Sequence, residues 1–299
     1  MSGMAQQAVR SAWVVVPQVQ ALRETVYGVK THYTHAGEGD PLVLVHGGGP
    51  GVSGGHAWEH NIPVLAERFH VYALDLIGNG YTDKPLIEYS FQTLVSHVAG
   101  FIDALNLSEV RLAGYSQGAY VAIKYTLEFP ARVRQVVLGG TGTLAKAVGL
   151  SDGGRSVKLP GFDGTKESLR RFLEVNHGDP SEINSLLETR YRVAALPGHR
   201  EYHASIARYN TILNRDASEQ QVFEVRERLG KLTVPWCLVW GEQDRSAPVD
   251  PLGYGLHELY PKAPFYVVRG SGHAVHHDKP EEYNRLALDF FGATAVVRH

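Results

Sequence analysis

Residues 110–119 read Val-Arg-Leu-Ala-Gly-Tyr-Ser-Gln-Gly-Ala, an apolar run that leads into the pattern G-x-S-x-G. The run predicts a strand, and a helical pattern begins at Ala119, so Ser116 is expected at a sharp strand-to-helix turn. A serine hydroxyl is a poor nucleophile unless it is exposed beside a base. Such a turn exposes it, and flanking glycines let strand and helix approach closely. The alternative is a plain tight turn; in this context we predict that Ser116 is a catalytic nucleophile.

A glycine-rich stretch from His46 to Gly51, His-Gly-Gly-Gly-Pro-Gly, follows the apolar run 42–45. Attack on a carbonyl puts negative charge on an oxygen, which needs backbone N–H donors in a dry pocket. We expect this oxyanion hole to use the N–H group of Gln117 and that of Gly48 or Gly49. Glycine-rich loops also bind phosphate, but no Lys-Ser/Thr pair follows, which excludes a P-loop.

Asp244 follows the apolar run 237–240 and is the candidate acid of a catalytic triad. Catalytic groups of open α/β sheets lie in loops at the carboxyl ends of the strands, where this residue is expected. Glu242 and Asp250 are alternative acids in the same stretch, because most loop carboxylates are simply solvated.

His273 follows the last apolar run, 265–268, and is the candidate base. The chain order Ser, Asp, His is the order in which the α/β-hydrolase fold arranges its triad. His276 and His277 complete an H-x-x-H-H pattern that could suggest a metal ion, but the spacing matches no known zinc motif. We therefore predict a triad of Ser116, Asp244 and His273, without a metal.

The rest of the chain alternates short apolar runs with helical patterns, which predicts an α/β fold with a mostly parallel sheet. Apolar residues recur at helical spacing in the expected helices, and Pro280 is a normal first residue of a helix. The expected strands are 42–45, 70–74, 110–113, 135–138, 237–240 and 265–268, and the expected helices are 90–105, 119–129 and 280–291.

Residues 143–232 lack a clear buried strand and are rich in helical patterns, such as 166–176 and 181–195. We expect a helical cap here, inserted into a core made of residues 1–142 and 233–299. Residues 1–20 are expected to be an extension, in which 12–16 could pair at a sheet edge.

The composition is that of an ordinary globular protein, with 299 residues, a formal net charge of −2 and 43% hydrophobic residues. No basic excess suggests a nucleic-acid partner. No apolar run is long enough for a membrane helix, and the N-terminus lacks the pattern of a secretion signal, so a cytoplasmic protein is expected. The single cysteine, Cys237, is expected to be a small buried hydrophobe.

From about Val29 to Phe291, the chain resembles an α/β-hydrolase with a helical cap, and His46 to Gly51 resembles the meta-cleavage-product hydrolases. These enzymes break a carbon–carbon bond in ring-opened aromatic compounds. The resemblance implies a serine hydrolase that needs no metal or organic cofactor and acts on a small molecule with a carbonyl group. It also implies a possible homo-oligomer.

In that family, a cap arginine binds the substrate carboxylate, and Arg190 is similar in placement. A guanidinium suits this role because it binds a carboxylate with two hydrogen bonds. The alternatives are a solvated helix arginine at 190 and the same role for Arg192. The family usually has asparagine where this chain has Tyr115 and Ala57, and tryptophan where it has Ala274. The side chain of Tyr115 could donate a hydrogen bond to substrate or could simply pack.

The sequence leaves three main functions open, with non-hydrolytic oxidation chemistry on the same fold as a remote fourth. The first is hydrolysis of the carbon–carbon bond of a ring-fission product, a vinylogous 1,5-diketone. The second is a carboxylesterase or lactonase with the same triad. The third is a small-molecule receptor that keeps the fold with little turnover, since fold does not fix function.

Overall fold

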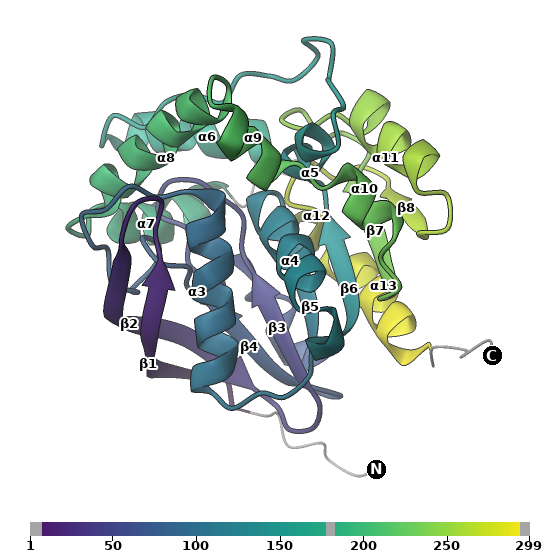
Figure 1. Cartoon of the computed structure of the whole chain (residues 1–299), viewed down its shortest axis with the longest axis horizontal. Helices are drawn as coiled ribbons and strands as arrows, with labels where there is room; N and C mark the ends of the chain where they lie inside the picture. The colour runs from purple at the N-terminus through teal and green to yellow at the C-terminus, as the bar shows by residue number, and fades with distance from the viewer. Residues whose placement is uncertain (1–7, 178–182, 294–299) are drawn as a thin grey trace.

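The computed structural model describes residues 8–177 and 183–293, and an eight-stranded sheet runs through it (Figure 1). The strand order is β1-β2-β4-β3-β5-β6-β7-β8. The six strands from β4 to β8 in this order run parallel, while β1 and β2 are antiparallel to their neighbours. The strands are β1 (Arg10–Gln20), β2 (Thr25–Ala36), β3 (Pro41–Val45), β4 (His70–Leu74), β5 (Val110–Tyr115), β6 (Val133–Gly139), β7 (Trp236–Gly241) and β8 (Phe265–Val268).

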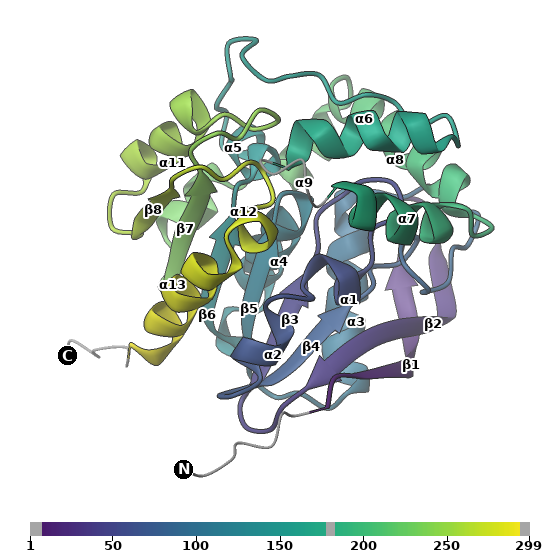
Figure 2. The same cartoon turned by 180° about the vertical axis from the view of Figure 1, so that it is seen from behind.

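Helices cover both faces of the sheet, as Figures 1 and 2 show from opposite sides. One hydrophobic cluster joins the sheet to α3 (Phe91–Ala104) and α4 (Gln117–Glu128). A second cluster joins the other face to α2 (Ile62–Leu65) and α13 (Pro280–Gly292). Strands buried on both faces must be apolar on both faces, which explains why the central strands read as continuous apolar runs. The predicted fold class, the six predicted strands and the three predicted core helices are confirmed, with α4 beginning two residues earlier than expected.

The N-terminal part of the chain confirms the expected pairing of residues 12–16 at a sheet edge and contains one strand that was not expected. Residues from Arg10 onward form the edge strand β1, which pairs over most of its length with β2. The expected edge pairing therefore extends over most of residues 10–20, and its partner β2 was not predicted. Both strands are partly exposed, so they lack the continuous apolar run that marks the central strands. Pro17 lies inside β1, where an edge position tolerates the missing N–H group.

In the part of the chain that the structure describes, six helices lie between β6 and β7, and Figure 2 shows α6, α7 and α8 above the carboxyl ends of the strands. The expected helix 166–176 is confirmed as α6. The expected helix 181–195 is seen as α7 from Ile183, and its first two residues lie outside the described part. The helices here are α5 (Gly142–Ala147), α6 (Lys166–Asn176), α7 (Ile183–Ala194), α8 (His199–Leu213), α9 (Ala217–Phe223) and α10 (Arg226–Gly230).

The remaining helices are short and lie in the connections of the core. None of the helices described is long and apolar enough to span a membrane. These short helices are α1 (Gly54–Ala57), α11 (Tyr254–Leu259) and α12 (Val275–Asp278), with a 3-10 turn at Pro130–Arg132 and a π-helical turn at Val249–Gly253.

Candidate active site

Ser116 lies between β5 and α4 with φ of 54° and ψ of −127°, a backbone conformation that non-glycine residues rarely adopt. Its N–H group donates to the carbonyl oxygens of Gly139 and Gly140, at 3.2 and 3.1 Å. The flanking glycines are required because a Cβ atom on Gly118 would lie 2.3 Å from the carbonyl oxygen of His46. The turn therefore holds the serine rigidly at the carboxyl edge of the sheet, half-buried.

The imidazole of His273 and the carboxylate of Asp244 form a buried pair, with 2.7 Å between Nδ1 and Oδ2. The other carboxylate oxygen of Asp244 accepts from the N–H groups of Ser246 and Ala247, at 3.0 and 2.8 Å. Burial lowers the pKa of His273, but the nearby Asp244 charge and hydrogen bond outweigh burial, so its pKa is raised. The acceptor carboxylate fixes the proton on Nδ1 and leaves Nε2 as the basic nitrogen.

Gly140 connects this pair to the serine turn. Its carbonyl oxygen accepts from the Ser116 N–H, and a Cβ atom built on it would lie 2.9 Å from Oδ2 of Asp244 and 3.7 Å from Nδ1 of His273. Within residues 8–177 and 183–293, no hydrogen bond joins the Ser116 hydroxyl to His273. In structures without substrate, such catalytic hydrogen bonds are often long and shorten only in the complex.

The glycine-rich loop lies directly against the serine turn. A Cβ atom on Gly47 would lie 3.0 Å from Cβ of Ser116, and one on Gly48 would lie 2.5 Å from Oε1 of Gln117. Among the hydrogen bonds of the described residues, none uses the N–H groups of Gly48, Gly49 or Gln117. Gly48 thus lies against Gln117, and these backbone N–H groups have no acceptor within the described part of the protein, as an oxyanion hole requires.

His46 holds this loop in place. Its Nδ1 lies 2.7 Å from the carbonyl oxygen of Gly47, and its Nε2 accepts from the N–H of Leu76 at 3.0 Å. Burial lowers the pKa of His46, which favours the neutral ring that these two bonds require. The histidine that opens the motif therefore positions the loop.

Arg190 is buried in α7 and reaches the same loop. Its Nε donates to the carbonyl oxygen of Pro50 at 3.0 Å, and its guanidinium lies over the ring of Phe172 with 5.6 Å to the ring centre. Nη2 is buried, and none of the residues that the structure describes hydrogen-bonds to it; a Cβ atom on Gly49 would lie 2.9 Å from it. Burial lowers the pKa of Arg190. Arg192, the alternative, is exposed.

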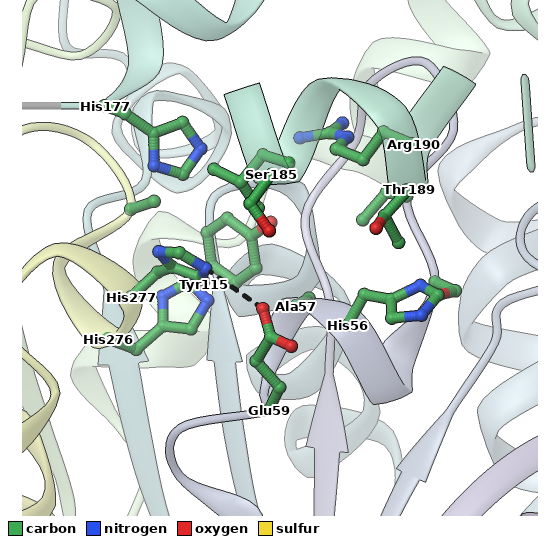
Figure 3. A pocket seen from close by; sticks show the side chains of 14 residues that line it. His56, Ala57, Glu59, Tyr115, His177, Ser185, Thr189, Arg190, His276 and His277 are labelled. Atoms are coloured by element: carbon green, nitrogen blue, oxygen red, sulfur yellow. Dashed lines mark hydrogen bonds and ion pairs between the residues drawn. The ribbon is translucent and has the colours of Figure 1, made fainter. Parts of the chain in front are cut away.

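A pocket lies between α7 and the core (Figure 3). Tyr115 and Ala274, the chain neighbours of the serine and histidine, line it together with Arg190 and Ala57. The ring of Tyr115 packs against His276 with 4.0 Å between ring centres. The other lining residues are largely polar: Val52, Ser53, His56, Glu59, His177, Ser185, Leu186, Thr189, His276 and His277.

The other candidate acids lie elsewhere. Glu242 is exposed and accepts from the N–H of Gly270 at 3.2 Å, while the exposed Asp250 pairs with Arg155 at 2.8 Å. Cys237 is fully buried, as expected, and burial raises its thiol pKa.

The H-x-x-H-H pattern does not act as one group of ligands. His277, but not His276, has ligand atoms within 4.8 Å of those of His177 and Asp278, and it also lies near Glu59. Contacts among these groups include 3.1 Å between His177 and Asp278 and 3.5 Å between His277 and Glu59, which is drawn as a dashed line in Figure 3.

Sequence reasoning missed Asn176, the last residue of α6. Its backbone carbonyl accepts from the N–H groups of His273 and Ala274, at 3.0 and 3.2 Å, and its side-chain oxygen accepts from the Ser246 hydroxyl at 3.2 Å. No local pattern marks this residue, because its main contact uses a backbone atom.

Comparisons with known proteins agree with this geometry. The α/β hydrolase fold family matches residues 40–280. The 2-hydroxy-6-oxo-2,4-heptadienoate hydrolase of Pseudomonas putida is 31% identical, over 89% of this chain and 94% of the relative. A 2-hydroxy-6-oxononadienedioate/2-hydroxy-6-oxononatrienedioate hydrolase of Paraburkholderia phymatum is 32% identical, over 88% of this chain and 91% of the relative.

Solved structures give the same result. The crystal structure of a serine hydrolase involved in carbazole degradation has a TM-score of 0.77 at 25% identity, covering 96% of this chain and all of that one. A meta-cleavage product hydrolase from Pseudomonas fluorescens has a TM-score of 0.73 at 27% identity, covering 93% and 98%. The chain belongs to the α/β hydrolase fold family, and its relatives there include hydrolases of 2-hydroxy-6-oxo-dienoates.

Proposed function

We propose that this protein is a serine hydrolase that cleaves the carbon–carbon bond of a ring-fission 2-hydroxy-6-oxo-dienoate. Ser116 is the nucleophile, His273 the base, and Asp244 the residue that orients it. The observation that carries the proposal is the buried His273–Asp244 pair beside a strained serine turn, next to a pocket that contains a buried arginine. Several relatives hydrolyse such dienoates.

The first chemical step follows from the proton positions. Asp244 keeps the proton of the neutral ring on Nδ1, so Nε2 of His273 can take the hydroxyl proton of Ser116 once a side-chain rotation brings the two together. The serine oxygen then bonds to the substrate carbonyl carbon. The resulting oxyanion is bound by the N–H groups of Gln117 and of Gly48 or Gly49.

Collapse of this intermediate releases the leaving group, which takes its proton from His273, and water then hydrolyses the acyl enzyme. In carbon–carbon cleavage the leaving group is a carbanion equivalent. That requires an earlier ketonisation of the dienol, in which His273 assists. In ester cleavage the leaving group is an alkoxide.

Arg190 is proposed to bind the substrate carboxylate. The buried guanidinium lies at the edge of the glycine-rich loop, and its Nη2 has no acceptor among residues 8–177 and 183–293, so a carboxylate would supply one. Residues 143–232, which carry this arginine, are proposed to form a cap unit over the core.

The second candidate is hydrolysis of a carboxylic ester by the same triad. Tyr115, Ala57 and Ala274 depart from the pattern of the dienoate hydrolases, and all three line the pocket. The dienol part of a substrate would therefore meet different side chains here, which favours a substrate that lacks it.

Steady-state kinetics on matched substrates test the two functions. We expect kcat/KM to be higher for a ring-fission dienoate, followed by loss of its yellow colour, than for a neutral p-nitrophenyl ester. Fast ester hydrolysis with no dienoate cleavage would establish the second candidate instead. If the protein consumes neither the dienoate nor the ester, both candidate functions are contradicted.

A further inference from the structure

A second Ser–His–Asp series lies apart from Ser116, on the antiparallel side of the sheet. The hydroxyl of Ser11 in β1 hydrogen-bonds to Nε2 of His32 in β2. Nδ1 of the same ring lies 2.8 Å from Oδ2 of Asp75, which follows β4. The atoms are joined in the order that a catalytic triad uses: hydroxyl to Nε2, and Nδ1 to carboxylate.

Hydrogen bonds around Asp75 fix the direction of the protons. The buried carboxylate also accepts from the N–H groups of Gly54 and Tyr81, at 2.6 and 2.8 Å. With the carboxylate acting as acceptor, Nδ1 of His32 carries the ring proton and Nε2 carries the lone pair. The Ser11 hydroxyl is then the donor, which is the arrangement that activates a serine.

The histidine ring is held firmly while the serine stays accessible. His32 is buried between the rings of Trp13 and Tyr81, edge-on to both, with ring centres 4.9 and 5.1 Å away. Ser11 is exposed on the edge strand. A base with a fixed orientation next to an open hydroxyl can act on a molecule that arrives from solvent.

An open groove with about 700 Å³ of empty space runs past Ser11. Trp13 and Tyr81 are 47% and 44% exposed in it, so a flat aromatic group could pack against them. The groove is lined by Ser11, Trp13, His32, Thr34, Ser53, Gly55, His56 and Tyr81.

We propose that Ser11 is a second nucleophile, which takes an acyl group from activated aryl esters. The oxygen of Ser11 bonds to the ester carbonyl carbon, and the bond from that carbon to the aryloxy oxygen breaks. His32 takes the hydroxyl proton and passes it to the departing aryl oxide. The products are a phenol and an acyl ester of Ser11. This goes beyond the proposed function, which uses Ser116 alone.

The experiment uses the full chain with Ser116→Ala, so that the outcome does not depend on the first serine. This variant is incubated with p-nitrophenyl acetate, digested and analysed by mass spectrometry. We expect the peptide with Ser11 to gain an acetyl group on the order of a hundredfold faster than the peptide with Ser151. Ser151 is the matched control, because it is an exposed serine whose oxygen accepts from the Gly153 N–H.

Two further variants test the role of the histidine. Ser116→Ala with Ser11→Ala should lose the burst of p-nitrophenol, and Ser116→Ala with His32→Gln should lose most of it. If Ser11 gains acetyl no faster than Ser151, or if His32→Gln leaves its labelling rate unchanged, Ser11 only caps the His32 ring and the proposal is wrong.

Discussion

The carbonyl oxygen of Asn176, at the end of α6, accepts a hydrogen bond from the backbone N–H of His273 at 3.0 Å. A helix of the insertion between β6 and β7 therefore holds the loop that carries the proposed base. The side chain of the same asparagine contacts Ser246, whose hydroxyl lies 3.2 Å from Oδ1 of Asp244. Both loops of the His273–Asp244 pair are thus tied to one residue of this insertion.

The Asn176–Ser246 hydrogen bond is expected to position the Asp244 loop. Asn176→Ala should lower kcat for a small neutral ester roughly 2- to 12-fold, because one hydrogen bond contributes about 0.5–1.5 kcal/mol. KM should change little, since neither side chain lines the pocket. A double-mutant cycle checks this: Asn176→Ala should add nothing to Ser246→Ala. Losses that multiply would show that the two residues act separately.

The fall of kcat/KM at low pH is expected to follow the protonation of His273. Its pKa is raised above the ordinary 6.5, so protonation removes the base at pH values where a free imidazole would still be neutral. The value of kcat/KM for a neutral ester should rise with pH, with a midpoint above 6.5.

Asp244→Asn tests whether the charge of Asp244 raises the pKa of His273. It should lower the midpoint, because the charge that raises the pKa is gone, and it should cut the rate by about four orders of magnitude through loss of the correct tautomer. A midpoint that is unchanged or higher in this variant would contradict the assignment.

Arg190→Ala should reduce kcat/KM for a carboxylate substrate roughly 10- to 150-fold, because a hydrogen bond to a charged group contributes about 1.5–3 kcal/mol. Neutral esters should be affected much less. Arg192→Ala is the matched control, since Arg192 is exposed two residues away in the same helix. Kinetics on one acid and one neutral ester measure the difference. Equal losses on both substrates would remove Arg190 from carboxylate binding.

The absence of a side chain at Gly51 is expected to let α7 approach the glycine-rich loop. A Cβ atom there would lie 1.9 Å from the carbonyl oxygen of Arg190, whereas one on Gly153 would meet nothing within 4 Å. Their φ angles are similar, 69° and 63°, so backbone strain is matched. Gly51→Ala should cost about 1–3 kcal/mol more than Gly153→Ala in the free energy of unfolding, measured with urea. Equal losses would mean that strain alone accounts for the effect.

Local sequence was enough to predict the central sheet. Strands that are buried on both faces are apolar on both faces, and β3, β4 and β7 read that way, while β5, β6 and the edge strand β8 still contain short apolar runs. Ser116, Asp244 and His273 could be predicted for a related reason: each follows a parallel strand, and these strands end at one edge. By contrast, β2 is half-exposed, so its sequence has no continuous apolar run. It also contains Gly28, at a φ of 67°, and glycine is uncommon inside strands.

Contacts between distant segments could not be predicted in this way. Asn176 contributes a backbone carbonyl, which any residue type supplies. The Ser11–His32–Asp75 series joins a strand at the sheet edge to a loop more than 60 positions later, and none of its members lies in a motif that shows this. Such groupings depend on strand register, which the printed sequence leaves open for exposed strands.

The most direct test of the central claim is the rate of dienoate cleavage by Ser116→Ala. With a saturating ring-fission dienoate, we expect kcat to fall by about five to six orders of magnitude, leaving only what the oxyanion hole and substrate binding contribute. The variant should keep the wild-type circular dichroism spectrum. Cleavage within tenfold of the wild-type rate would contradict the account, because the hydroxyl at position 116 would then not be the nucleophile.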